Sequence, residues 1–154
     1  MKVRTGDQAM VREVNRALIL DLLRKNDVIS RVQIAKTLHL SKFTVSTIVS
    51  ELIEQEFVIE SGKGDAPKKG GPKPILLSLN PSDKFVIGVD IEIKNSVVAI
   101  ANLKGEILTR TCVPTNKEHS VENVVEQVSS LINDITEHAH ISHDSILGIG
   151  ISIG

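Results

Sequence analysis

Three apolar stripes at helical spacing follow one another in the first 56 residues, and they leave few folds open to this part of the chain. Ser30 and Ser41 stand where the second and third helices, residues 31–38 and 42–56, each need an N-cap. Helices this short each bury one face, so the three must share a core. The first stripe, in residues 11–25, comprises Val11, Val14, Leu18, Ile19, Leu22 and Leu23.

The second and third helices have the steric pattern of a DNA-binding helix-turn-helix, RVQIAKTLHLSKFTVSTIVS from Arg31 to Ser50. Ala35 is small at the point where the two helices cross, since a larger side chain would force them apart. His39 occupies the turn, where the left-handed conformation costs a non-glycine residue about 1 kcal/mol. The predicted joint core consists of Ile34, Leu38, Leu40, Val45 and Ile48.

The side chains that the third helix leaves outside this core are short and polar, apart from one Lys and one Phe. Such a helix can lie deep in a major groove, where Ser and Thr hydroxyls meet bases or phosphates. Arg12 and Arg16 on the first helix are expected to add phosphate contacts. The predicted DNA-binding residues of the helix-turn-helix are Arg31, Ser41, Lys42, Phe43, Thr44, Ser46, Thr47 and Ser50.

A basic, glycine-rich segment separates two short strands expected at residues 57–60 and 75–79. The segment, SGKGDAPKKGGPK, has four Gly, two Pro and four Lys and too little apolar surface to pack. Its composition fits a flexible linker equally well, but a strand on either side favours a hairpin. We expect this hairpin to be a wing beside the third helix, reaching phosphates or the minor groove through Lys63, Lys68, Lys69 and Lys73.

The charges of the two halves have opposite sign, although the whole chain carries only −1. Up to Asn80 there are 13 basic and 9 acidic residues, and from Pro81 onward there are 5 and 10. We therefore expect two domains, residues 1–80 and 81–154, of which the first suits a polyanionic partner. Aromatic residues make up only 2%, which removes the stacking surfaces that single-strand and RNA readers use.

The cysteine count and the hydropathy pattern predict a cytoplasmic chain. A single Cys112 forms no internal disulfide, the N-terminus lacks a signal-type apolar core, and no segment approaches the roughly 20 apolar residues that cross a bilayer. His138, His140 and His143 lie at an expected helix end without the i, i+4 spacing of metal ligands. No metal site and no cofactor are therefore expected.

The sequence pattern of the second half predicts a three-stranded antiparallel meander, a long helix and a last strand. The meander strands are expected near residues 85–91, 97–101 and 107–108, and Ser120 is placed to cap a helix of about five turns. Residues 146–153 are apolar on both faces, which predicts a strand in the middle of a sheet. Such a strand needs neighbours and covering helices, so we expect a domain that stops midway and a partner on its open edge.

With these motifs in view, the sequence resembles the ROK family of repressors and sugar kinases, and within it the xylose repressors of Gram-positive bacteria. The segments that carry the resemblance are DQAMVREVNRALILDLL, SKFTVSTIVSELI, GGPKPILLSLN and VIGVDIEIKNSVVAIANLKGEI. The resemblance implies an α+β chain, with a winged helix-turn-helix over residues 1–80. Residues 81–154 would be the truncated N-terminal lobe of a sugar-sensing domain, an incomplete actin-like (RNase H-like) α/β half-domain.

The resemblance also implies a function and its partners. The chain is expected to repress a sugar-utilisation operon, that of xylose in this group, by binding double-stranded operator DNA as a homodimer. Release by a sugar effector would need the part of the protein that holds the family's sugar-contacting residues and zinc loop, which lie beyond Gly154. In the wing, Pro72 and Lys73 stand where members often carry paired Arg.

Kinase activity is not expected, because the phosphate-binding turn of the kinase members is altered. Those members follow the first Asp of the second domain with a glycine-rich turn and a Thr, whereas Asp90 here precedes IEIKN. No Gly lets the backbone approach phosphate, and Glu92 would repel it. Two alternatives stay open beside the repressor, namely a vestigial sugar kinase and a protein-interaction module built on the three-helix unit.

Overall fold

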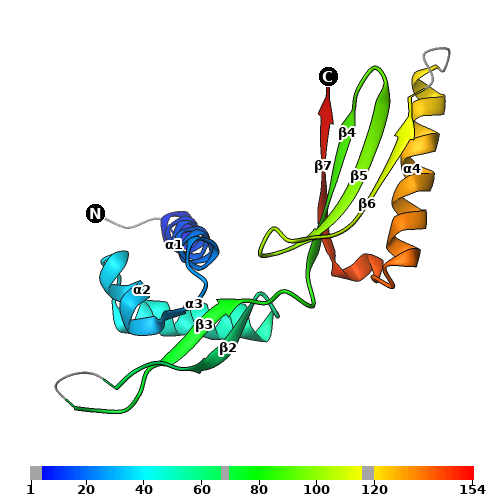
Figure 1. Cartoon of the computed structure of the whole chain (residues 1–154). Helices are drawn as coiled ribbons and strands as arrows, with labels where there is room; N and C mark the ends of the chain where they lie inside the picture. The colour runs from blue at the N-terminus through cyan, green and yellow to red at the C-terminus, as the bar shows by residue number, and fades with distance from the viewer. Residues whose placement is uncertain (1–4, 67–69, 116–119) are drawn as a thin grey trace. The chain divides into compact units, whose positions relative to one another are not determined.

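A computed structural model describes residues 5–66, 70–115 and 120–154 (Figure 1). The chain divides into two compact units, Met1–Asn80 and Pro81–Gly154. Within the described ranges, the first unit has three α-helices and a small antiparallel sheet, and the second has a four-stranded sheet and one α-helix. The predicted α+β class is therefore confirmed.

The first unit is a helical domain that ends in a β-hairpin. Its helices are α1 (Thr5–Lys25), α2 (Arg31–Thr37) and α3 (Lys42–Glu54). The strands β2 (Val58–Lys63) and β3 (Ile75–Leu79) pair antiparallel, which confirms the hairpin over the linker. The two-residue strand β1 (Ile29–Ser30), which the sequence pattern does not predict, pairs with the other edge of β3.

Side-chain caps determine where the two short helices begin. Ser30 Oγ accepts from the Gln33 backbone N–H, and the Gln33 side chain accepts from the Ser30 N–H, so α2 starts with a complete capping box. Ser41 Oγ accepts from the Thr44 N–H at 3.0 Å at the start of α3. Both predicted N-caps are confirmed.

The turn between α2 and α3 is closed by a non-glycine residue in the left-handed conformation. His39 has a φ of 54°, as the sequence predicts for the turn. The next residue, Leu40, donates its N–H to the Ala35 carbonyl at 3.0 Å. Glu56 takes the same conformation just after α3, with a φ of 63°. These turns direct the chain sharply from each helix into the next element.

The core of the first unit lies between α2, α3 and the sheet, and only the C-terminal half of α1 reaches it. The predicted α1 stripe is therefore wrong at Val11, Val14 and Leu18, which are 58%, 50% and 46% exposed, and right at the buried Ile19 and Leu23. The physical reason is that α1 meets β3 near its C-terminal end, while polar side chains join its remainder to α3. The residues with less than 3% exposure are Ile19, Leu23, Ile34, Val45, Val49, Leu52, Val58 and Leu77.

The second unit is a sheet with one long helix packed on one face. The strands β4 (Phe85–Ile91), β5 (Asn95–Asn102) and β6 (Ile107–Pro114) form the predicted antiparallel meander. The helix α4 (Val121–His138) begins at its predicted cap, Ser120, and packs over β5 and β6. A short 3₁₀ turn, η1 (His143–Ser145), leads into β7 (Ile146–Ile153).

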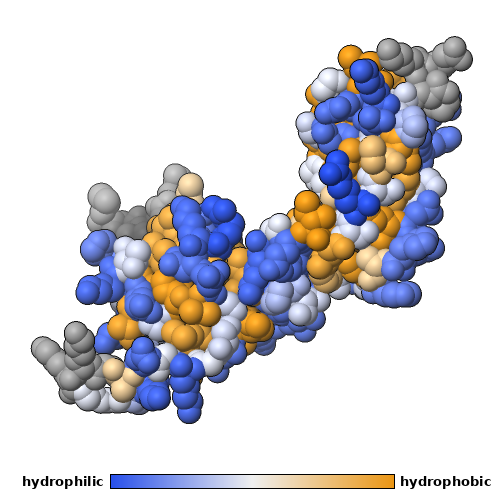
Figure 2. Space-filling model, viewed as in Figure 1, coloured by the Kyte–Doolittle hydropathy of each residue, from blue (hydrophilic) through white to orange (hydrophobic). Residues whose placement is uncertain are grey.

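The last strand, β7, lies at an edge of the described sheet and not in its middle, and this leaves the open edge that the sequence predicts. The sheet order is β6–β5–β4–β7, with β7 parallel to β4. Ile149, Ile151 and Ile153 are 50%, 60% and 79% exposed. Their register partners on β4 include the buried Ile87 and Val89, so this apolar row continues the core face beyond the reach of α4. Figure 2 shows apolar surface on this unit.

Candidate nucleic-acid interface

The helix-turn-helix consists of α2, the turn at His39 and α3, and the β2–β3 hairpin follows as a wing (Figure 1). Ala35 is 7% exposed, and Ile34 and Val45 are completely buried. Leu38 and Leu40, which were predicted to join the core, are only half-buried. This packing buries one face of α3 and leaves the opposite face to solvent, as a recognition helix requires.

The solvent face of α3 is built from small hydroxyl side chains, one Lys and one Phe. Ser46, Thr47 and Ser50 are exposed, and Thr44 is half-buried. From position 42 to position 50 the helix carries no Arg, Asn, Gln or acidic residue. Short side chains allow the helix backbone to approach the floor of a groove closely.

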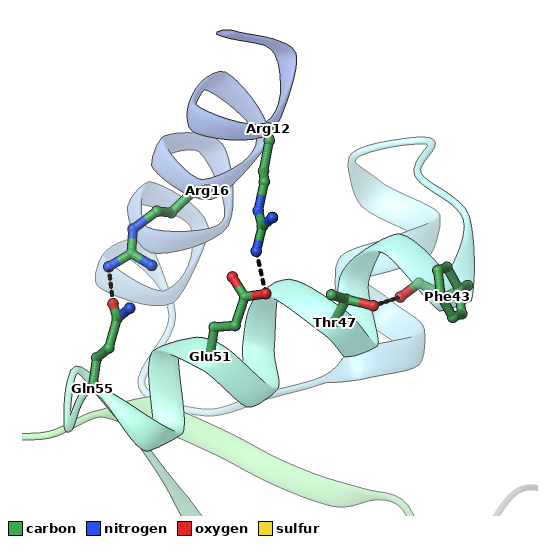
Figure 3. Close-up of polar contacts among 6 residues, drawn as sticks. All are labelled: Arg12, Arg16, Phe43, Thr47, Glu51 and Gln55. Carbon is green, nitrogen blue, oxygen red and sulfur yellow. Dashed lines mark hydrogen bonds and ion pairs between the residues drawn. The ribbon is translucent and has the colours of Figure 1, made fainter. Parts of the chain in front are cut away.

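Two of these hydroxyls have partners within their own helix. Thr47 Oγ1 donates to the Phe43 carbonyl oxygen at 3.0 Å (Figure 3), and Thr44 Oγ1 lies 2.8 Å from Ser41 Oγ. Because the Thr47 hydroxyl donates its hydrogen to the helix backbone, it cannot also donate that hydrogen to a base. The hydroxyl groups of Ser46 and Ser50 have no hydrogen-bond partner within the described part of the chain, so each can donate or accept.

The wing extends the basic surface of the first unit. Lys63 ends β2 and Lys73 precedes β3, and both are exposed. The Gly64 N–H donates to the Pro74 carbonyl at 2.8 Å, which continues the hairpin beyond β2. A bulge at Gly62, with a φ of 124°, interrupts the register just before Lys63, and bulges increase the local twist of a strand. Lys68 and Lys69, also predicted to bind DNA, lie outside the described residues.

Arg31 joins the helix-turn-helix to the wing. It is the first residue of α2, and its guanidinium lies 3.5 Å from the Glu60 carboxylate on β2. Its side chain is only 27% exposed, so the predicted DNA contact would require it to exchange Glu60 for a phosphate. Sequence reasoning missed Glu60 because nothing in the local pattern shows which side chain a distant strand brings beside Arg31.

The two Arg residues of α1 face α3, although the sequence predicted phosphate contacts for them. Arg12 forms a hydrogen bond and an ion pair with Glu51, and Arg16 Nη2 donates to Gln55 Oε1 at 2.6 Å (Figure 3). The guanidinium of Arg16 also lies 5.4 Å from the centre of the Phe57 ring. Glu51 raises the pKa of Arg12, first by its hydrogen bond and then by its charge. These side chains line a polar hollow of about 790 Å³ between the two helices.

The turn that follows β4 differs from a phosphate-binding turn. The Glu92 N–H donates to the Asn95 carbonyl at 3.0 Å, so the connection after Asp90 closes on itself. The connection contains no glycine. A backbone N–H already bound in this way is not free to cradle a phosphate oxygen.

The histidines at the end of α4 do not converge. Nδ1 of His138 lies 2.8 Å from the Asp134 carbonyl. Across the described ranges, no three His, Cys, Asp or Glu side chains are grouped so that they could hold a metal ion. Among the same residues, no helix combines the length and the apolar content that crossing a bilayer demands.

The helix-turn-helix has a buried core, its second helix, α3, has one exposed face, and a basic β-hairpin follows. Together these features define a winged helix-turn-helix, a class of DNA-binding domain. Residues 15–59 match a family model described as winged helix-turn-helix DNA-binding. Across 96% of its length the chain is 32% identical to the putative xylose repressor of Caldicellulosiruptor sp. strain Rt8B.4. It is 29% identical to the xylose repressor of Bacillus subtilis strain 168, again over 96% of its length.

The fold similarity extends over both units. The crystal structure of a ROK family transcriptional regulator, a homolog of the E. coli MLC protein, matches 93% of this chain with a TM-score of 0.70 at 20% identity. The chain spans about 37% of the length of the Caldicellulosiruptor relative and 36% of that solved chain. These matches confirm the predicted resemblance to the N-terminal portion of ROK-family repressors. The family model confirms the predicted winged helix-turn-helix over residues 15–59.

Proposed function

We propose that this chain is the operator-binding part of a sequence-specific transcriptional repressor. In this proposal residues 1–80 bind double-stranded DNA and residues 81–154 are the N-terminal lobe of a sugar-sensing domain. The observation that carries the proposal is the solvent face of α3, where exposed hydroxyls at Ser46, Thr47 and Ser50 lie on a helix anchored by the buried Val45 and Val49. Such a helix fits a major groove.

The proposed partners are a second copy of the chain, an inverted-repeat operator and a sugar. The first two follow from the symmetry of helix-turn-helix binding sites, and the sugar follows from the names of the relatives. A homodimer would bring two recognition helices to an inverted repeat, with half-sites about one helical turn apart. The xylose repressors among the relatives support a xylose-utilisation operon as the target, with release by sugar binding in the full-length protein. Binding to chromosomal operators implies a cytoplasmic location.

The proposal is tested by measuring affinity for a selected inverted-repeat duplex and for a random duplex at moderate salt. We expect the selected duplex to bind at least about a thousandfold more tightly. Equal affinity for the two duplexes would contradict the proposal.

The basic residues supply a second test. Lys42→Ala, Lys63→Ala and Lys73→Ala should each reduce the salt dependence of binding by about one unit of slope, since each removes one phosphate contact. Lys94→Ala, in the second unit, serves as the matched control and should leave the slope unchanged. An unchanged slope in all four variants would exclude the wing and the start of α3 from the DNA contact.

The proposal treats the chain as a regulator and not as an enzyme. The closed turn after Asp90 supports this, because the Glu92 N–H that could approach a phosphate is bound to Asn95. Calorimetry with ATP and Mg²⁺ should detect no binding to the chain, and saturable binding would favour the vestigial kinase.

A further inference from the structure

Phe43 differs from the rest of the α3 surface. Its ring is 81% exposed at the second position of the helix, whereas the aliphatic residues Val45, Ile48 and Val49 are at most 3% exposed. The domain core closes without this ring, so packing does not account for it. A single exposed apolar residue is common on protein surfaces, and its meaning therefore depends on where it lies.

The surroundings of Phe43 combine one small apolar spot with polar neighbours. Its ring and Thr47 both line a shallow hollow of about 310 Å³ that extends to Val11 and Asn15 on α1. The bond from Thr47 Oγ1 to the Phe43 carbonyl turns that hydroxyl toward the helix backbone (Figure 3), leaving the γ-methyl as the other group that Thr47 can present. Lys42 and the hydroxyl of Ser46 flank the spot.

The chemistry of the major groove limits what such a spot can recognise. Bidentate readout of guanine or adenine uses Arg, Lys, Asn or Gln, and of these residue types positions 42–50 hold only Lys42. The only methyl group that unmodified DNA presents in that groove is the 5-methyl of thymine, which Phe and Thr methyl groups contact. An apolar ring beside a Thr methyl group on a recognition helix is complementary to this thymine methyl group.

We infer that Phe43, together with the γ-methyl of Thr47, reads a thymine through its 5-methyl group in each half-site of the bound duplex. This inference rests on the proposed function and adds the base that the helix recognises. A protein partner fits the spot less well, because a stable protein interface needs about 800 Å² on each side with an apolar centre. Here the hollow beside the ring is small and is lined by the polar Gln8, Arg12 and Asn15 as well as by Val11.

The experiment uses the full chain and the duplex that it selects most tightly from a randomised library. Each thymine of that duplex is replaced in turn by 2′-deoxyuridine, which removes only the 5-methyl group. We expect wild-type affinity to fall about fourfold at one thymine of each half-site, as burial of one methyl group predicts. Phe43→Ala should bind more weakly and show a thymine-to-uracil ratio close to one at that position, while Phe43→Leu should keep part of the ratio.

The control and the opposing outcomes separate this inference from the proposed function. Val14→Ala removes a side chain that is 50% exposed on α1 and should leave the ratio at its wild-type value. A tightly bound duplex with no thymine sensitivity, or a Phe43→Ala variant that keeps the full ratio, overturns the inference alone. Failure to select any duplex overturns the proposed function as well. If Phe43→Ala instead changes the oligomeric state by light scattering and leaves the ratio intact, the ring is a protein contact and the inference is overturned.

Discussion

Helix α3 of the first unit and strand β7 of the second differ in how they expose apolar side chains. In the first unit, α3 buries Val45 and Ile48 and exposes hydroxyls beside a single ring. In the second unit, β7 exposes a whole row, with Ile149, Ile151 and Ile153 at 50%, 60% and 79%. A mixed polar face suits a wet, charged partner such as DNA, whereas a continuous apolar row suits another packed layer. The contrast indicates that the exposed face of α3 suits a polar partner and that the exposed row of β7 suits an apolar one.

The largest expected effect is on the unfolding free energy of each unit, and it shows whether the two units are stabilised independently. Ile34→Ala and Ile100→Ala each open a cavity at a completely buried position, which should cost about 2–5 kcal/mol of unfolding free energy. Hydrogen exchange followed by mass spectrometry should show lost protection only in residues 1–80 for the first variant and only in residues 81–154 for the second. Equal loss in both units for either variant would show that they unfold as one.

The next largest effect concerns the apolar row of β7. We expect the chain to self-associate at high concentration, and Ile151→Lys to weaken that association by about 1.5–3 kcal/mol for each side chain no longer buried. Light scattering over a concentration series measures the effect. Val121→Lys changes a side chain that is 76% exposed on α4 and should leave the association unaffected. A wild-type chain that stays monomeric throughout the series would show that the exposed row of β7 does not pack against another copy.

A smaller effect is expected at the start of the recognition helix. Ser41→Ala removes the acceptor for the Thr44 N–H and should lower the unfolding free energy of the first unit by about 1 kcal/mol. Ser46→Ala, at an exposed position, should change it by less than about 0.5 kcal/mol. Urea denaturation followed by circular dichroism distinguishes the two, and equal values would mean that Ser41 does not act as a cap.

The smallest effect is electrostatic and lies at the end of α1. Hydrogen bonds from Lys25, and after it Arg24, lower the pKa of Asp21. A lowered pKa in the folded state means that the contribution of Asp21 to stability is present above its ordinary pKa and is lost as the pH falls through the lowered value. An NMR titration should show a larger upward shift of the Asp21 pKa for Lys25→Ala than for Arg24→Ala. Identical titration curves in all three proteins would show that the pairs do not form in solution.

Most of the elements could be predicted because their signals are local. Ser30, Ser41 and Ser120 cap helices where the sequence places them, since a cap binds a backbone N–H only three residues away. His39 takes its left-handed conformation for a similarly local reason. The candidate site was predictable as a set of residue types on α3 and the wing, but its internal bonds, such as that from Thr47 to the Phe43 carbonyl, were not.

The sequence by itself determined the helix-turn-helix pattern, the meander and the family resemblance, because apolar spacing, caps and turns act within a few residues of one another. Only the tertiary structure decided that Arg12 and Arg16 face Glu51 and Gln55, that Arg31 pairs with Glu60, and that β7 lies at a sheet edge. Each of these contacts depends on which distant segment packs alongside. The local sequence around an apolar or charged side chain does not specify that segment.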